Sequence, residues 1–165
     1  MLGELREAGE EMSDLVVSLQ DLGVVAAALV AGGQIFVLFV VIRTARNMNL
    51  LDSFHLHQKM LSTDYPDVYI QPSGILVVVL GAVLLGIERR TTANVVLTVV
   101  PMAAIACIIV LTRLINRPIN RALGTWSDED VERYPAMRRR WDRSHAVRAT
   151  CGTVAFVSYV ILANH

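Results

Sequence analysis

Long uncharged hydrophobic blocks, separated by short polar segments, dominate the pattern along this chain. Four such blocks stand out, at residues 22–42, 68–87, 91–112 and 149–165. An α-helix rises about 1.5 Å per residue, so roughly 20 residues cross a hydrocarbon core of about 30 Å. The first three blocks are long enough for this, and the fourth must borrow residues from the helix before it.

The pattern predicts an all-α fold, a four-transmembrane-helix bundle with amphipathic segments at the membrane surface. We expect a single membrane domain over residues 1–165. Its spans are predicted at about residues 21–43, 70–88, 92–116 and 145–163. Pro72 stands near the start of the second span, where a helix tolerates proline. The hydrophobic content of 54% agrees with this class and is high for an ordinary soluble domain.

Two amphipathic segments accompany the spans. Apolar residues recur at three- to four-residue steps over residues 2–19, which predicts a helix that lies along the surface or extends the first span. Between the first two spans, Asp52 or Ser53 can cap a short helix over residues 54–61.

The first span carries a face of small residues, Gly23, Ala27 and Ala31, spaced four apart. Small residues allow helix backbones to approach closely, and in lipid such packing drives helix association. We therefore expect this face to contact another helix. Gln34 is the one strongly polar side chain of the span, and it either makes an inter-helix hydrogen bond or lines a pocket.

Charge is distributed unevenly, although the net charge is zero. Four spans place loops 43–71 and 113–148 on one side of the membrane, and these loops carry most of the basic residues. The opposite side has only Arg6, Arg89 and Arg90. The positive-inside tendency then predicts a multi-pass protein of the cell membrane with both termini outside and the two basic loops in the cytoplasm.

Polar side chains gather where the third span ends and the fourth begins. Asn116 and Asn120 are four residues apart and project from one helix face. Trp141, His145 and Arg148 follow at helical spacing on the next long helix. Both groups lie on the same side, so they could surround a cavity open to the membrane. The alternative is a hydrogen-bonded network that only pins the two spans together.

A metal site is a weaker alternative. His55 and His57 form a His-x-His pair, which chelates readily on a strand, but on a helix the two rings diverge by about 200°. A copper or haem site that uses His57 and His145 is a further alternative, because both histidines are predicted on the same side of the membrane.

The same polar residues carry a resemblance to the anthrone oxygenase-like family of small four-span membrane proteins. An Asn-x-Pro-x-Asn motif closes the third span and is followed by a leucine and a tryptophan (Asn116, Pro118, Asn120, Leu123, Trp126). An Arg-x-Trp-x-x-x-His-x-x-Arg motif opens the fourth (Arg139, Trp141, His145, Arg148). Arg117, inside the first motif, departs from the apolar or small residue expected there and makes the region more cationic.

The resemblance implies oxidation of an anthrone to an anthraquinone, with molecular oxygen as co-substrate and no metal or organic cofactor. His145 would act as the general base, because its pKa range suits proton removal at neutral pH. Asn116, Asn120 and Arg148 would hold the developing oxyanion, and Trp141 would stack on the flat substrate.

The expected partners are a lipophilic aromatic small molecule and the lipid bilayer, with no nucleic acid. A homo-oligomer or a larger membrane complex is compatible with the sequence. The main alternative function is a non-catalytic accessory subunit of such a complex. Transport through a carboxylate proton relay is disfavoured, because no acidic residue lies within the four uncharged blocks that form the spans.

Overall fold

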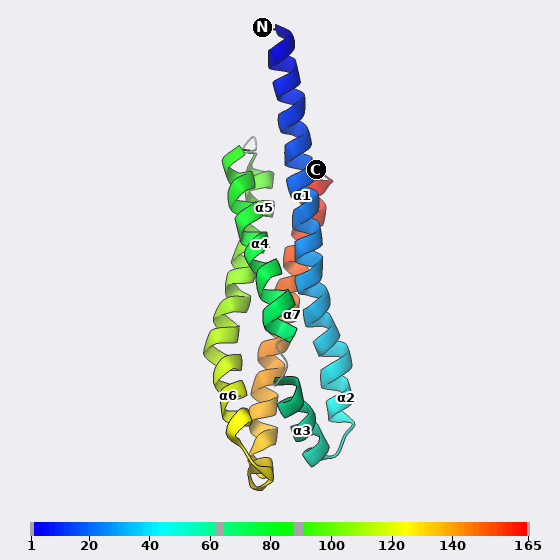
Figure 1. Cartoon of the computed structure of the whole chain (residues 1–165), viewed down its shortest axis with the longest axis vertical. Coiled ribbons are helices and arrows are strands. Elements are labelled where there is room, and N and C mark those ends of the chain that lie inside the picture. Colours follow the sequence, from blue (N-terminus) through cyan, green and yellow to red (C-terminus); the bar gives the residue numbers. More distant parts are fainter. Residues whose placement is uncertain (1, 62–64, 88–90, 165) are drawn as a thin grey trace.

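The computed structural model of the chain describes residues 2–61, 65–87 and 91–164, and every regular element in these ranges is helical. Helices α1 (Leu2–Phe36) and α5 (Thr92–Leu111) run in one direction along the long axis. Helices α4 (Tyr65–Ile87) and α7 (Tyr134–Ala163) run in the opposite direction (Figure 1). The predicted all-α bundle is confirmed.

Two of these helices continue through a π-helical turn into a shorter α-helix. Helix α1 passes through η1 (Val37–Val41) into α2 (Ile42–Arg46). Helix α5 passes through η2 (Thr112–Asn116) into α6 (Arg117–Thr125). In each π turn the closing hydrogen bond spans five residues instead of four, so each turn contains one extra residue.

Two shorter helices lie at the end of the bundle formed by the basic segments 43–71 and 113–148, which we call the basic end. Helix α3 (Leu50–Leu61) begins earlier than predicted, because Asn49, rather than Asp52 or Ser53, accepts a hydrogen bond from the first turn at 2.9 Å. The 3-10 helix η3 (Asp128–Arg133) is closed by a capping box on Ser127.

Within the described ranges, three continuous helical stretches are long and apolar enough to cross a membrane: Arg6–Arg46, Thr92–Thr125 and Asp128–Ala163. A fourth apolar helical stretch, Gln71–Ile87, is shorter. These lengths fit a membrane protein. Pro72 lies inside α4, which begins at Tyr65, so the prediction that Pro72 stands near a helix start is wrong.

The N-terminal segment extends the first span, which was one of its two predicted placements. The helix is continuous from Leu2 to Phe36, and its first part projects beyond the other helices (Figure 1). Within this part, Met12 and Leu15 are about half exposed.

The small-residue face of α1 packs against α7, as predicted. Ala27 is fully buried, and a Cβ added at Gly152 of α7 would lie 3.2 Å from Cα of Ala31. A Cβ added at Gly23 would lie 2.2 Å from the ring of Tyr159. The two backbones can therefore approach only because these positions lack larger side chains.

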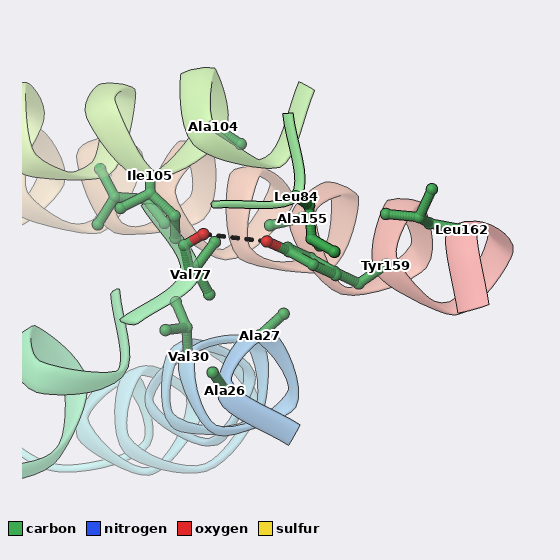
Figure 2. Packing of buried hydrophobic residues seen from close by; sticks show 11 residues of the cluster. Ala26, Ala27, Val30, Val77, Leu84, Ala104, Ile105, Ala155, Tyr159 and Leu162 are labelled. Atoms are coloured by element: carbon green, nitrogen blue, oxygen red, sulfur yellow. Dashed lines mark hydrogen bonds between the residues drawn. The ribbon is translucent and has the colours of Figure 1, made fainter. Parts of the chain in front are cut away.

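Two hydrophobic clusters lie at different levels of the bundle. The first fills the space between α1, α4, α5 and α7, where Tyr159 donates a hydrogen bond to the carbonyl of Val77 at 3.0 Å (Figure 2). The second lies at the basic end and includes Phe54, Leu123 and Tyr134.

Candidate functional site

A layer of buried polar side chains separates the two hydrophobic clusters. On α1, Gln34 lies between Val30 of the first cluster and Ile42 of the second. On α7, His145 lies between Trp141 of the second cluster and Ala155 of the first. Buried polar groups are costly without partners, so this layer must satisfy its own hydrogen bonds.

Asn116 stands at the centre of the layer. In the amide orientation that satisfies both of its polar atoms, the nitrogen donates to Ser144 Oγ at 2.7 Å and to the carbonyl of Leu111 at 3.2 Å. The oxygen accepts from Trp141 Nε1 at 3.2 Å and from Arg148 Nη2 at 3.3 Å. Asn116 therefore joins the end of α5 to two turns of α7.

Trp141 is enclosed by other side chains. Its single Nε1–H is shared between the side-chain oxygens of Asn116 and Asn120, the latter at 3.1 Å. Its ring stacks on that of His145 with centroids 5.1 Å apart and an angle of 9° between planes. The ring of His57 meets it edge-on at 4.8 Å, and the guanidinium carbon of Arg138 lies 5.8 Å from its centroid. A substrate can stack on Trp141 only if one of these neighbours moves.

Both ring nitrogens of His145 are engaged. Nη2 of Arg148 lies 2.6 Å from Nδ1, and Nε2 lies 2.9 Å from the carbonyl oxygen of Gln34. A guanidinium can only donate, so Nδ1 accepts, and Nε2 carries the proton and donates to the carbonyl. His145 is thus held as a neutral imidazole in one tautomer.

Arg148 connects this layer to a cavity of about 200 Å³ between α1, α4, α5 and α7. Its Nη1 donates to Thr112 Oγ1 at 3.1 Å, while its Nε has no hydrogen-bond partner in the described part of the chain. Gln34 also lines the cavity, and its Oε1 is likewise buried without a partner there. The pocket-lining alternative holds for the Gln34 side chain, whereas the hydrogen bond to α7 is accepted by its backbone carbonyl and not made by its side chain.

The predicted site residues therefore converge, but they do not all reach the cavity. Asn116, Asn120, Trp141 and His145 lie behind its wall, linked through hydrogen bonds and ring contacts. Arg148 is the member of the predicted set that lines it. The cavity is mainly apolar, with walls formed by residues such as Val30, Ile75, Ile105 and Ile108.

A second polar network, which the sequence reading missed, lies on the basic side of Trp141. Arg138 donates to Asp142 at 2.7 Å and to the hydroxyl of Tyr134 at 2.6 Å, and Arg46 reaches Asp142 at 3.2 Å. The Tyr134 hydroxyl donates to the carbonyl of Ser53 at 3.0 Å. These contacts fasten α2 and α3 to α7.

His57 joins this network and is buried against Trp141. Its Nδ1 lies 3.4 Å from the Tyr134 hydroxyl, and its Nε2 has no partner among the described residues. Burial, followed by the positive charge of Arg138, lowers the pKa of His57 from 6.5 to about 3. His57 is therefore neutral at physiological pH.

The metal alternatives find limited geometric support. His55 is exposed, and its Nε2 lies 2.7 Å from Asp128, whereas His57 is buried, so the two rings diverge as helix geometry requires. Within the described residues, no group of three or more histidine, cysteine or carboxylate side chains is placed to hold a metal ion. A copper or haem site on His57 and His145 stays a prediction, with the indole of Trp141 in contact with both rings.

Long apolar helices around a buried polar layer and a lateral cavity define a small helical membrane protein. Residues 60–158 match the sequence model of the anthrone oxygenase family, which is more than half of the chain. The chain therefore belongs to the anthrone oxygenase family, and the resemblance given by its motifs is confirmed. No curated protein and no solved structure matches it.

Proposed function

We propose that the protein crosses the cell membrane four times, with both termini outside and loops 43–71 and 113–148 in the cytoplasm. The three long apolar stretches and the shorter Gln71–Ile87 supply the spans, and the arginines of the second loop supply the cytoplasmic charge. Arg89 and Arg90, assigned to the opposite side, lie outside the described residues. A cysteine introduced at the C-terminus of the protein tests this orientation. In intact cells, a membrane-impermeant thiol reagent should label it if the C-terminus is outside.

Within this membrane, the proposed activity is oxidation of a lipophilic polycyclic aromatic substrate of the anthrone type by molecular oxygen. Family membership supports the reaction class. The observation that carries the proposal is the apolar cavity of about 200 Å³. Two of its lining residues, Gln34 and Arg148, each have one buried atom without a partner among the described residues, and both residues also bond to His145. An apolar cavity of about 150 Å³ already binds benzene, so this one accepts at least one aromatic ring.

The chemistry balances without an external reductant. The central methylene of an anthrone is acidic because its anion is a phenolate-like aromatic system. After a base removes one methylene proton, the carbanion bonds to one oxygen atom of O₂, and the resulting peroxide takes up a proton. Loss of the second methylene hydrogen together with the terminal hydroxyl, as water, leaves the quinone carbonyl. One O₂ is consumed and one water is released.

His145 is the proposed base, and Nδ1 is its one basic nitrogen in the observed tautomer. The guanidinium of Arg148 covers that nitrogen, so Arg148 must turn toward the cavity before His145 can accept a proton. In that position the guanidinium can donate to the oxyanion that forms as the proton leaves. Proton removal and charge stabilisation are thus coupled through one side chain.

Asn116, Asn120 and Trp141 then act on the reaction through their neighbours. In this arrangement they hold the rings and the guanidinium in place from behind the cavity wall. The positions of His145 and Arg148 depend on these contacts, because catalytic groups lose efficiency when displaced by about 1 Å.

Oxygen uptake by detergent-purified protein supplied with an anthrone tests the proposal, first without metal and then with copper or iron. We expect metal-independent uptake that falls about 10²- to 10⁴-fold in His145→Ala. His55→Ala is the matched control, because His55 is exposed and pairs with Asp128 at the surface.

Uptake that survives in His145→Ala at the normal rate would contradict the role of this histidine. Uptake that requires copper or iron would favour the metal alternative. No uptake under any of these conditions would overturn the oxygenase proposal and favour an accessory subunit of a larger complex.

A further inference from the structure

The cavity has one apolar end and one polar end. On α1, the apolar lining residue Val30 comes before polar Gln34. On α5 and its continuation η2, which run in the same direction as α1, apolar Ile105 comes before polar Thr112. On α4, which runs the opposite way, polar Gln71 comes before the apolar lining residues (Figure 1). The polar lining residues of all three helices therefore lie at the end of the cavity that faces the basic end of the bundle.

Two arginines stand at this polar end. Arg113 and Arg117 line the cavity, are exposed, and lie four residues apart, across the junction of η2 and α6. Within the described part of the chain, neither arginine has a carboxylate partner. Arg46 and Arg138, by contrast, both bind Asp142. An anion that entered the cavity would therefore meet two cations free to bind it.

An unmatched donor and an unmatched acceptor lie farther inside. Nε of Arg148 is a donor and Oε1 of Gln34 is an acceptor, and both are buried without partners among the described residues. Burying a polar group without a partner is unfavourable, so a ligand that satisfies both groups gains affinity. A hydroxyl group can do so, because it donates and accepts at once.

We propose that the cavity takes its substrate as an aromatic acid. A carboxylate on the substrate binds Arg113 and Arg117, the ring system lies between the apolar walls, and a ring hydroxyl meets Gln34 and Arg148. The polycyclic nature of the ligand rests on the proposed function, whereas the requirement for an anionic group rests on the two arginines. An anionic lipid shares this chemistry, and the test separates the two sources.

The test measures binding rather than turnover. Anthraquinone-2-carboxylate and its neutral carboxamide are titrated calorimetrically into the full-length protein in zwitterionic detergent, which requires no oxidation. We expect the carboxylate to bind at least about tenfold more tightly than the carboxamide, because hydrogen bonds to a charged group are stronger than those between neutral groups. This preference should weaken as ionic strength rises.

The double variant Arg113→Gln/Arg117→Gln should lose the preference and keep the affinity for the carboxamide. Arg121→Gln is the matched control, because Arg121 is exposed on the same helix α6 and does not line the cavity. If the double variant fails to fold, the salt dependence of the wild-type protein still tests the proposal. A carboxylate preference that does not weaken as ionic strength rises would contradict binding by the two arginines. Equal binding of the two ligands, or a preference that survives in the double variant, would overturn the proposal.

Competition identifies the source of the anion. An excess of phosphatidylglycerol should leave the carboxylate bound; displacement at equal concentration would assign the site to a lipid headgroup and contradict the aromatic-acid proposal. A carboxylate preference in a protein that consumes no oxygen would refute the oxygenase function and leave the ligand class standing. Oxygen uptake without any carboxylate preference would support the oxygenase function and refute the aromatic-acid proposal.

Discussion

Arg148 donates from Nη2 to Nδ1 of His145 at 2.6 Å, and this contact determines which ring nitrogen carries the proton. We expect long-range ¹H–¹⁵N correlation spectra of histidine-labelled protein to show His145 as the Nε2–H tautomer at neutral pH. In Arg148→Met the Nδ1 lone pair is released, so the fraction of the Nδ1–H tautomer should rise. Signals of exposed His55 should not change, and an Nδ1–H tautomer in the wild-type protein would contradict the hydrogen-bond assignment.

The burial of His57 predicts a loss of stability in mild acid. An unfolded histidine takes up a proton near pH 6.5, whereas folded His57 stays neutral down to its pKa of about 3. The free energy of unfolding therefore falls as the pH drops through this interval, by about 2 kcal/mol between pH 7.5 and pH 5. Thermal unfolding at these two pH values should show the loss in the wild type and a smaller one in His57→Gln.

His55→Gln is the control for this pH dependence, because His55 is exposed and sits two residues away on the same helix. This variant leaves the buried ring of His57 in place, so its unfolding should still show the loss of stability in acid that His57 causes. An acid response that persists unchanged in His57→Gln would show that other groups cause it.

Asp142 holds two arginines at the basic end, and its loss should be costly. Its side chain is 10% exposed and that of Arg138 is 11% exposed, so Asp142→Asn leaves a buried guanidinium without a counter-ion. We expect the free energy of unfolding to fall by about 3 kcal/mol. Glu10→Gln, which removes a pair between two exposed side chains, should have little effect. Equal stability of the two variants would contradict the structural role of Asp142.

Close packing of α1 on α7 predicts that Gly23→Ala destabilises the bundle. The added Cβ would lie 2.2 Å from the ring of Tyr159, which must shift and weaken its hydrogen bond to Val77. Overpacking of this kind costs about 1–3 kcal/mol, to be measured by thermal unfolding. Gly32→Ala lies on the same helix with open space around it and should unfold at the wild-type temperature or above.

Much of the fold follows from two features that can be counted in the sequence, the length of the uncharged blocks and the spacing of residues within them. Blocks of about 20 uncharged residues give the long helices, and steps of three and four residues give their faces. The face of Gly23, Ala27 and Ala31 meets α7 for this reason. The same steps brought Asn116 and His145 into one layer, because both lie on faces that turn inward.

The sequence could not predict which side chains contact each helix face. That depends on helix rotation, and here two π turns change the rotation without any signal in the hydrophobic pattern. Trp141 was predicted as an open stacking surface, yet the short helix α3 places His57 against it. The ion pair of Arg46 with Asp142 joins residues 96 positions apart, beyond the reach of any local pattern, and Arg138 extends it to Tyr134.

The two π turns also change the direction in which the residues after them face, compared with an unbroken α-helix of the same sequence. One residue corresponds to about 100° of rotation in an α-helix. Deleting a single residue from η2 would let an unbroken α-helix run from α5 into α6 and would leave Asn120 facing Trp141, because the turn already contains one extra residue. A deletion within the α-helical part of α5 would instead turn Asn120 away from Trp141 by about that angle. The length of this helix is thus constrained by angular register everywhere except at its π turn.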